Sequence, residues 1–93
     1  MIRIFVGKRF SHSLQHLDAA SRERLSEILA EVSQHFGNPH RHAGLGLRKL
    51  SPGLWECRLD IRSRVVFMKE KDRLIAYDVM SHDEIRAWLK NVK

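Results

Sequence analysis

The sequence is poor in the residues that disulfide-bonded, membrane-spanning and low-complexity proteins need. It has a single cysteine, Cys57, among 93 residues, so no disulfide can form within the chain. Small secreted domains usually carry several cysteines, and we therefore expect a reducing, cytoplasmic setting. The longest unbroken apolar runs are about four residues, against the ~20 that a membrane-spanning helix needs, so no membrane partner is expected. Two prolines and five glycines exclude collagen-like and low-complexity architectures.

Motifs of several common chemistries are also absent. The segment 44–46, Gly-Leu-Gly, lacks the further glycine and the helix of a phosphate-binding loop, and no nucleophile-elbow pattern occurs. His12 and His16 are four residues apart, and His40 and His42 are two apart. Neither pair has a carboxylate or thiolate at a spacing typical of a metal site. We therefore expect no metal and no other cofactor.

What the chain does have is an apolar fraction large enough for a core and a surplus of positive charge. Hydrophobic residues make up 43% and charged residues 30%, which indicates one globular domain spanning residues 1–93. The net charge is +6, and residues 40–73 alone carry nine basic and four acidic residues, a net of +5. Such a concentration favours a polyanion or an acidic protein as partner. A solvated basic face that keeps a small protein soluble is the other explanation.

Hydrophobic periodicity predicts the element order β-α-α-β-β-β-β-α. A strand is expected over residues 1–6 and a helical hairpin over 10–36, broken near 18–21 and ended by Gly37-Asn38-Pro39. A basic, histidine-rich loop is expected over 39–44, followed by strands over 45–50, 55–62, 64–69 and 74–80. Ser81 and Glu84 form a capping box that opens a last helix. The apolar stripe of that helix consists of Ile85, Trp88, Leu89 and Val92.

This order predicts an α+β fold in which the last strands form an antiparallel meander. Short turns join consecutive strands, and the apolar run 65–68 suggests a strand that is covered on both faces, or nearly so. We expect the helical hairpin and the C-terminal helix to cover one face of the sheet, because their apolar stripes need a partner. The other face, which carries Arg58, is then partly open.

The candidate site is a group of basic side chains on the strands. Alternation over 55–62 puts Glu56, Arg58, Asp60 and Arg62 on one face, and Arg64 begins the next strand across a tight turn. A guanidinium binds phosphate bidentately and keeps its charge near neutral pH. It can therefore position a phosphodiester and stabilise the additional negative charge of its transition state. Further candidates for nucleic-acid binding are Arg41, Arg48, Lys49 and Arg62.

Several of these residues have two interpretations. Glu56 and Asp60 are either salt-bridge partners of Arg58 and Arg62, or Glu56 is a general base. His82 stands at the start of the last helix, where it either gives or takes a proton or is simply an exposed residue of the first turn.

The segment 50–60, Leu-Ser-Pro-Gly-Leu-Trp-Glu-Cys-Arg-Leu-Asp, followed by Arg-Val-Val-Phe at 64–67, resembles the RelE/ParE superfamily of toxins from type II toxin–antitoxin pairs. Members show a leucine, a glycine, an aromatic residue and a basic residue at these spacings, then a short turn and an arginine before an apolar run. The layout of the whole chain fits, and the specific motif covers about a fifth of it.

The resemblance implies a curved antiparallel sheet with a helical hairpin on one side. It also implies either ribosome-dependent cleavage of mRNA, which leaves a 2′,3′-cyclic phosphate, or inhibition of DNA gyrase as in the ParE branch. Arg58 matches the basic residue that holds the substrate and helps activate the 2′-hydroxyl, and Arg64 matches the arginine that stabilises the transition state. His82 falls near an acid/base position of some nucleases. An acidic antitoxin is the implied protein partner.

The chain departs from the nuclease pattern at three positions. Glu56 replaces a second strand lysine, Asp83 stands where an arginine often follows the last strand, and Leu89 replaces a C-terminal tyrosine. Three functions therefore stay open at this point: an mRNA endoribonuclease, a gyrase inhibitor, and a module that binds an antitoxin or nucleic acid without catalysis.

Overall fold

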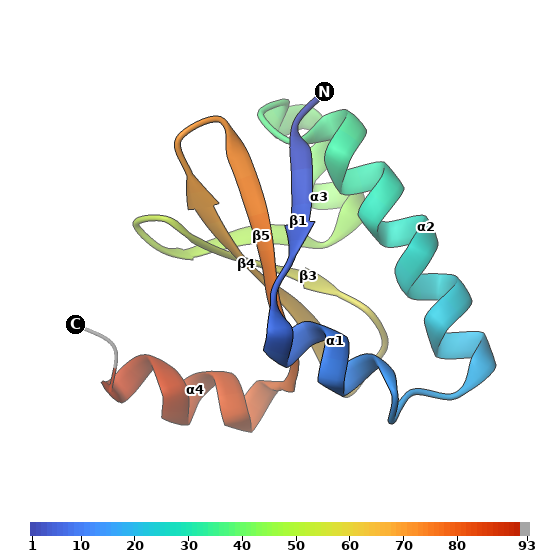
Figure 1. Ribbon diagram of the computed structural model, residues 1–93. Coiled ribbons are helices and arrows are strands. Elements are labelled where there is room, and N and C mark those ends of the chain that lie inside the picture. Colours follow the sequence, from blue (N-terminus) through green and yellow to red (C-terminus); the bar gives the residue numbers. More distant parts are fainter. Residues whose placement is uncertain (92–93) are drawn as a thin grey trace.

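The computed structural model describes residues 1–91, and these form a mixed sheet with helices on both faces (Figure 1). The elements follow in the order β1 (Arg3–Val6), α1 (Lys8–Leu14), α2 (Ala19–His35), α3 (Pro39–Leu45), β2 (Leu47–Ser51), β3 (Leu54–Arg58), β4 (Ser63–Glu70), β5 (Arg73–Ser81) and α4 (His82–Asn91). The predicted α+β class is confirmed. Val92, which the periodicity assigns to the apolar stripe of the last helix, lies outside the described residues.

The strands lie in the order β1-β5-β4-β3-β2. The predicted meander is confirmed, since β2, β3, β4 and β5 pair antiparallel with their neighbours in sequence. The first strand is different, because β1 pairs parallel to β5, with Arg3 opposite Arg73 and Val6 opposite Ala76. The sheet is therefore mixed rather than wholly antiparallel.

The larger core lies between the sheet and the helical hairpin. Val65 and Phe67 of β4 are completely buried on this face, against the apolar stripe of α2 and against Phe10 of α1. The stripe of α2 consists of Leu25, Ile28 and Val32. We call this side of the sheet the α2 face. The break between the two helices lies at residues 15–18, slightly before the predicted 18–21, and Asp18 caps α2 by accepting a hydrogen bond from the Ser21 N–H at 2.7 Å. That hydrogen bond also lowers the pKa of Asp18.

The C-terminal helix covers the opposite side of the sheet, which we call the α4 face. Val66 of β4 and Met80 of β5 are buried there against Ile85, and the Tyr77 and Trp88 rings stack with centroids 5.0 Å apart. Figure 1 shows α2 and α4 on opposite sides of the strands. The prediction that both cover one face is therefore wrong. Helices on both faces of the sheet explain the unbroken apolar run of β4, because successive strand residues point to opposite sides.

Two segments differ locally from the prediction. Residues 39–45 form the helix α3 rather than a loop, because Pro39 suits a first helical turn and Gly46 ends the helix in the left-handed conformation, with φ 72°. Strand β3 ends at Arg58, four residues earlier than expected. The side chain of Asp60 accepts hydrogen bonds from the backbone N–H groups of Arg62 and Ser63, both at 2.8 Å, and so folds this segment into a turn.

The predicted capping box of the last helix is present. The Glu84 N–H donates to Ser81 Oγ at 3.1 Å, and the Ser81 N–H donates to the Glu84 carboxylate at 2.8 Å. Because β5 runs directly into α4, this box fixes the direction of the helix at the residue next to His82. Across residues 1–91, no helix is long and apolar enough to cross a membrane.

Cys57 is an inert thiol in this fold. Its side chain is 1% exposed, and Sγ donates to the Leu45 carbonyl oxygen at 3.2 Å. Burial raises the pKa of Cys57 to about 11.

We expect alkylation of Cys57 by iodoacetamide at pH 8 to be at least ~100-fold slower than that of free cysteine, because the thiolate is the reactive form. Labelling followed by mass spectrometry checks this, and unfolding in urea should restore the normal rate. Rapid labelling of the folded protein would contradict the burial of Cys57.

Candidate functional site

A pocket of about 370 Å³ opens on the α4 face, where the ends of three strands meet α3 and the first residue of α4. All three residues predicted to be catalytic line it: Arg58 from β3, Arg64 from β4 and His82 from α4. The remaining lining residues are Ala43, Gly46, Leu47, Arg48 and Glu56. The structure thus brings together three side chains that are separated in the sequence, since Arg58 and His82 are 24 residues apart.

Arg58 and Arg64 lie directly opposite each other on neighbouring strands. Arg64 is held by its own turn, since Nη1 donates to the carbonyl oxygens of Asp60 at 2.8 Å and of Ser63 at 3.1 Å. Within residues 1–91, neither arginine forms an ion pair with a carboxylate. The interpretation of Arg58 as a salt-bridge partner of the nearby acids is therefore wrong. Two arginines at facing positions of neighbouring strands, neither of them in an ion pair among the described residues, can bind an anion such as a phosphodiester.

The glycine that ends α3 allows the approach of Arg58 to the pocket wall. The N–H of Arg58 donates to the Gly46 carbonyl oxygen at 3.3 Å. A Cβ at position 46 would lie 3.2 Å from the Cβ of Arg58, and the positive φ of this residue is itself unfavourable for other amino acids. A glycine is therefore required here both for the turn and for the close packing against β3.

Glu56 is the acidic member of the pocket. It is 4% exposed and pairs with Arg48, the residue opposite it on β2, with 2.7 Å between Arg48 Nε and Glu56 Oε2. One of the two interpretations that the sequence allows pairs Glu56 with Arg58, its neighbour on the same strand face. The cross-strand pairing of Glu56 with Arg48 depends on the register between β2 and β3, and no motif in the sequence specifies that register.

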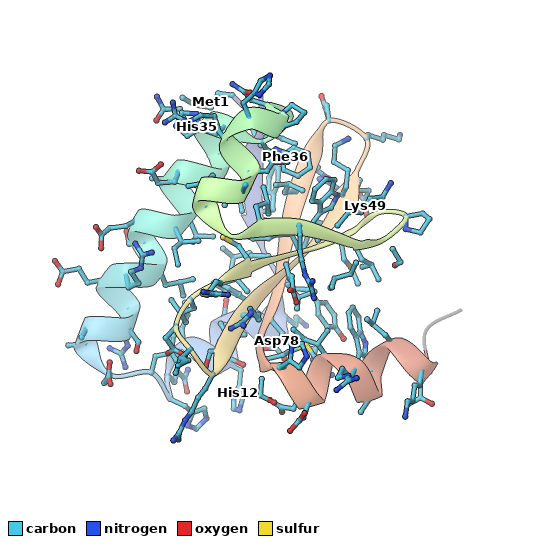
Figure 2. All side chains as sticks on the ribbon, turned by 180° about the vertical axis from the view of Figure 1, so that it is seen from behind. Met1, His12, His35, Phe36, Lys49 and Asp78 are labelled. Atoms are coloured by element: carbon cyan, nitrogen blue, oxygen red, sulfur yellow. The ribbon has the colours of Figure 1, made fainter. Side chains whose placement is uncertain are left out.

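The other predicted nucleic-acid contacts are dispersed. Lys49 lies opposite Trp55, which packs in the core of the α2 face, so it points away from the pocket; Figure 2 shows it near the end of β2. Arg41 lines a separate pocket of about 400 Å³ between α2 and α3. Arg62 lies in the turn after β3 and does not share the strand face of Arg58. Of this group, only Arg48 lines the same pocket as Arg58 and Arg64.

A buried carboxylate that no sequence pattern indicates connects α1 to the sheet. Asp78 is 8% exposed, accepts a hydrogen bond from Ser13 Oγ, and lies 3.6 Å from Arg9 Nε. The Arg9 guanidinium also lies over the Tyr77 ring, 5.4 Å from its centroid. Figure 2 shows Asp78 between α1, which carries His12, and α4. Ser13 and Arg9 lie 65 or more residues before Asp78 in the sequence, so no local sequence pattern predicts these contacts.

No protein-family model and no curated protein matches the sequence. Solved structures do match the fold. The RelE–RelB complex from Pyrococcus horikoshii aligns with a TM-score of 0.69 at 20% identity, covering 86% of this chain and 93% of that one. The protein has the fold of the RelE/ParE toxins. A YoeB/ParE toxin from Agrobacterium tumefaciens gives 0.66 at 20% identity over 87% and 99% of the two chains. The YoeB–YefM complex from Staphylococcus aureus gives 0.63 at 16% identity over 88% and 98%.

The RelE/ParE toxin fold agrees with the resemblance seen in the segment 50–67. A short sequence motif and the arrangement of nearly the whole chain indicate the same fold. At these identities the likeness establishes the fold, whereas the chemistry must be argued from the side chains of the pocket.

Proposed function

We propose that this chain is the toxin of a type II toxin–antitoxin pair and that it inhibits translation by cleaving mRNA on the ribosome. The observation that carries the proposal is the convergence of Arg58, Arg64 and His82 on one pocket, with neither arginine neutralised by a carboxylate among the described residues. The toxin fold is the supporting context.

The proposed reaction is an attack by the 2′-hydroxyl oxygen of a nucleotide on its own 3′-phosphate. The new bond joins the 2′-oxygen to phosphorus, and the bond from phosphorus to the 5′-oxygen of the next nucleotide breaks. Arg58 and Arg64 hold the non-bridging oxygens and stabilise their increased charge in the transition state. His82, which is exposed at the pocket, takes the proton of the 2′-hydroxyl, and the departing 5′-oxygen takes a proton from water. The products are a 2′,3′-cyclic phosphate and a 5′-hydroxyl.

The proposed protein partner is an acidic antitoxin. Residues 40–73 carry a net charge of +5, and this segment includes all three arginines that line the pocket, Arg48, Arg58 and Arg64. An acidic segment laid over the pocket would neutralise these charges and block the approach of a phosphate. Similar structures include toxins solved together with RelB and YefM antitoxins, which supports a partner of this kind.

The test compares two targets with the same purified protein. We expect primer extension to show discrete cuts in an mRNA that is engaged by ribosomes, with 2′,3′-cyclic phosphate ends. A parallel supercoiling assay with DNA gyrase should show no inhibition. Intact message together with inhibited gyrase would replace this function with the ParE-like one, and inactivity in both assays would leave only a binding module and overturn the proposed catalysis.

A further inference from the structure

Glu56 is a buried acid in a pocket whose other charged groups are cationic. It lies on the same strand face as Arg58, two residues away, and directly opposite Arg48 on β2. On its other side, β4 places Val66 opposite Glu56, so Arg64 is its diagonal neighbour, at a distance that long side chains can bridge. The remaining titratable group of the pocket is His82 of α4. Glu56 therefore lies among all the charges to which we assign catalysis.

The two carboxylate oxygens of Glu56 have different surroundings. Oε2 is occupied by Arg48, at 2.7 Å from its Nε. Oε1 has less than 1 Å² of accessible surface, and no atom of residues 1–91 forms a hydrogen bond with it. A general base must come within hydrogen-bond distance of the proton that it removes. Neither oxygen is presented to a substrate in the pocket, whereas the side chain of His82 is exposed.

We propose that Glu56 is a positioning residue that acts through Arg48, and that it is not the base. This inference rests on the proposed nuclease function. The carboxylate holds the Arg48 guanidinium at the rim of the pocket, where its side chain is 64% exposed and able to contact the RNA backbone. It also offsets the repulsion among three arginines, because like charges directly opposite on neighbouring strands are destabilising. A buried carboxylate with one unsatisfied oxygen is costly, and this electrostatic role explains its place in the pocket.

The experiment is a double-mutant cycle on cleavage of ribosome-bound mRNA, using Glu56→Gln, Arg48→Gln and the double variant. Glutamine keeps the size of glutamate and can still accept a hydrogen bond, so we expect E56Q to lower kcat/KM by about tenfold or less, mainly through KM. R48Q should have a similar effect, and the double variant should be no worse than either single one. The pH dependence of kcat should be unchanged in E56Q and should lose its acidic limb in His82→Gln.

A different set of results would identify Glu56 as the general base. If Glu56 were the base, E56Q would lower kcat by roughly 10²- to 10⁴-fold whether or not Arg48 is present, and the acidic limb of the pH profile would disappear. Either finding would overturn the positioning role. Effects of E56Q and R48Q that simply add would also overturn it. Arg48→Lys provides a second variant that leaves Glu56 in place, and it should recover part of the activity lost in R48Q.

Failure of the nuclease function would be seen separately. Wild-type protein that leaves ribosome-bound mRNA intact contradicts that function. The coupling between Glu56 and Arg48 is then measured as the affinity for a fluorescein-labelled 2′-O-methyl RNA oligonucleotide, which no 2′-hydroxyl attack can cleave. Non-additive losses of affinity support the positioning role, and additive losses contradict it.

Discussion

Replacement of Arg64 by alanine is expected to slow cleavage of ribosome-bound mRNA by roughly 10²- to 10³-fold, the usual loss when one preorganised donor to a developing negative charge is removed. The backbone carbonyls of Asp60 and Ser63 hold the Arg64 guanidinium in place before any substrate binds. Little reorganisation is therefore needed when the charge on the phosphate increases. The measurement is the single-turnover rate of cleavage at saturating protein, read by primer extension.

Arg3→Ala is the matched control for Arg64→Ala. Arg3 is an exposed arginine on β1, at the edge of the sheet opposite to β2, and it does not line the pocket. Its loss removes the same charge and should change the rate by less than about threefold, in line with the small effect of a distant exposed charge. Equal rates for wild type and Arg64→Ala would exclude Arg64 from transition-state stabilisation. Circular dichroism and urea unfolding of both variants establish that the fold is intact.

Phe67→Ala is expected to cost about 3–5 kcal/mol of unfolding free energy, which is a large part of the ~5–15 kcal/mol available to a domain of this size. Phe67 lies on β4, a strand with neighbours on both sides, and its side chain is 0% exposed in the core of the α2 face. Truncation removes apolar contacts from the sheet to the helices and leaves a cavity between them. Urea titration followed by tryptophan fluorescence measures the change.

Ile61→Ala is the control for this stability prediction. Ile61 is also a large apolar residue, but it is 89% exposed in the turn after β3. Its truncation should change the unfolding free energy by less than ~0.5 kcal/mol. Similar losses for Phe67→Ala and Ile61→Ala would contradict the burial on which the described core depends.

The sequence predicts which residues are buried better than it predicts which face they cover. The apolar run of β4 and the stripe of α4 both indicate burial, but periodicity does not say on which side of the sheet a helix will pack. The parallel pairing of β1 with β5 joins segments about 70 residues apart, so no local turn signal specifies it. The sequence does not predict helix α3, because a proline after Gly37 and Asn38 indicates the end of α2, although it also suits the start of the next helix.

Local sequence signals place part of the candidate site. The short turn between Arg58 and Arg64 predicts that these two residues lie near each other, whereas the capping box puts His82 only at the start of the last helix and does not bring it to the arginines. Arg62 was misplaced because the side-chain hydrogen bonds of Asp60 end the strand alternation after Arg58. The predicted salt bridge of Glu56 with Arg58 is also wrong. The actual partner, Arg48, depends on how β2 pairs with β3, and the register of that pairing shifts between Lys49 and Ser51.

The direct passage from β5 into α4 has a consequence for the synthesis of the protein. Arg58 and Arg64 belong to the middle of the chain, but His82 follows the last strand, and the first strand of the sheet has no neighbour until that last strand is in place. A nascent chain from which only the earlier hairpins have emerged would contain Arg58 and Arg64 but not His82, and its sheet would be incomplete. For most of each round of elongation, the nascent chain would therefore lack the completed pocket.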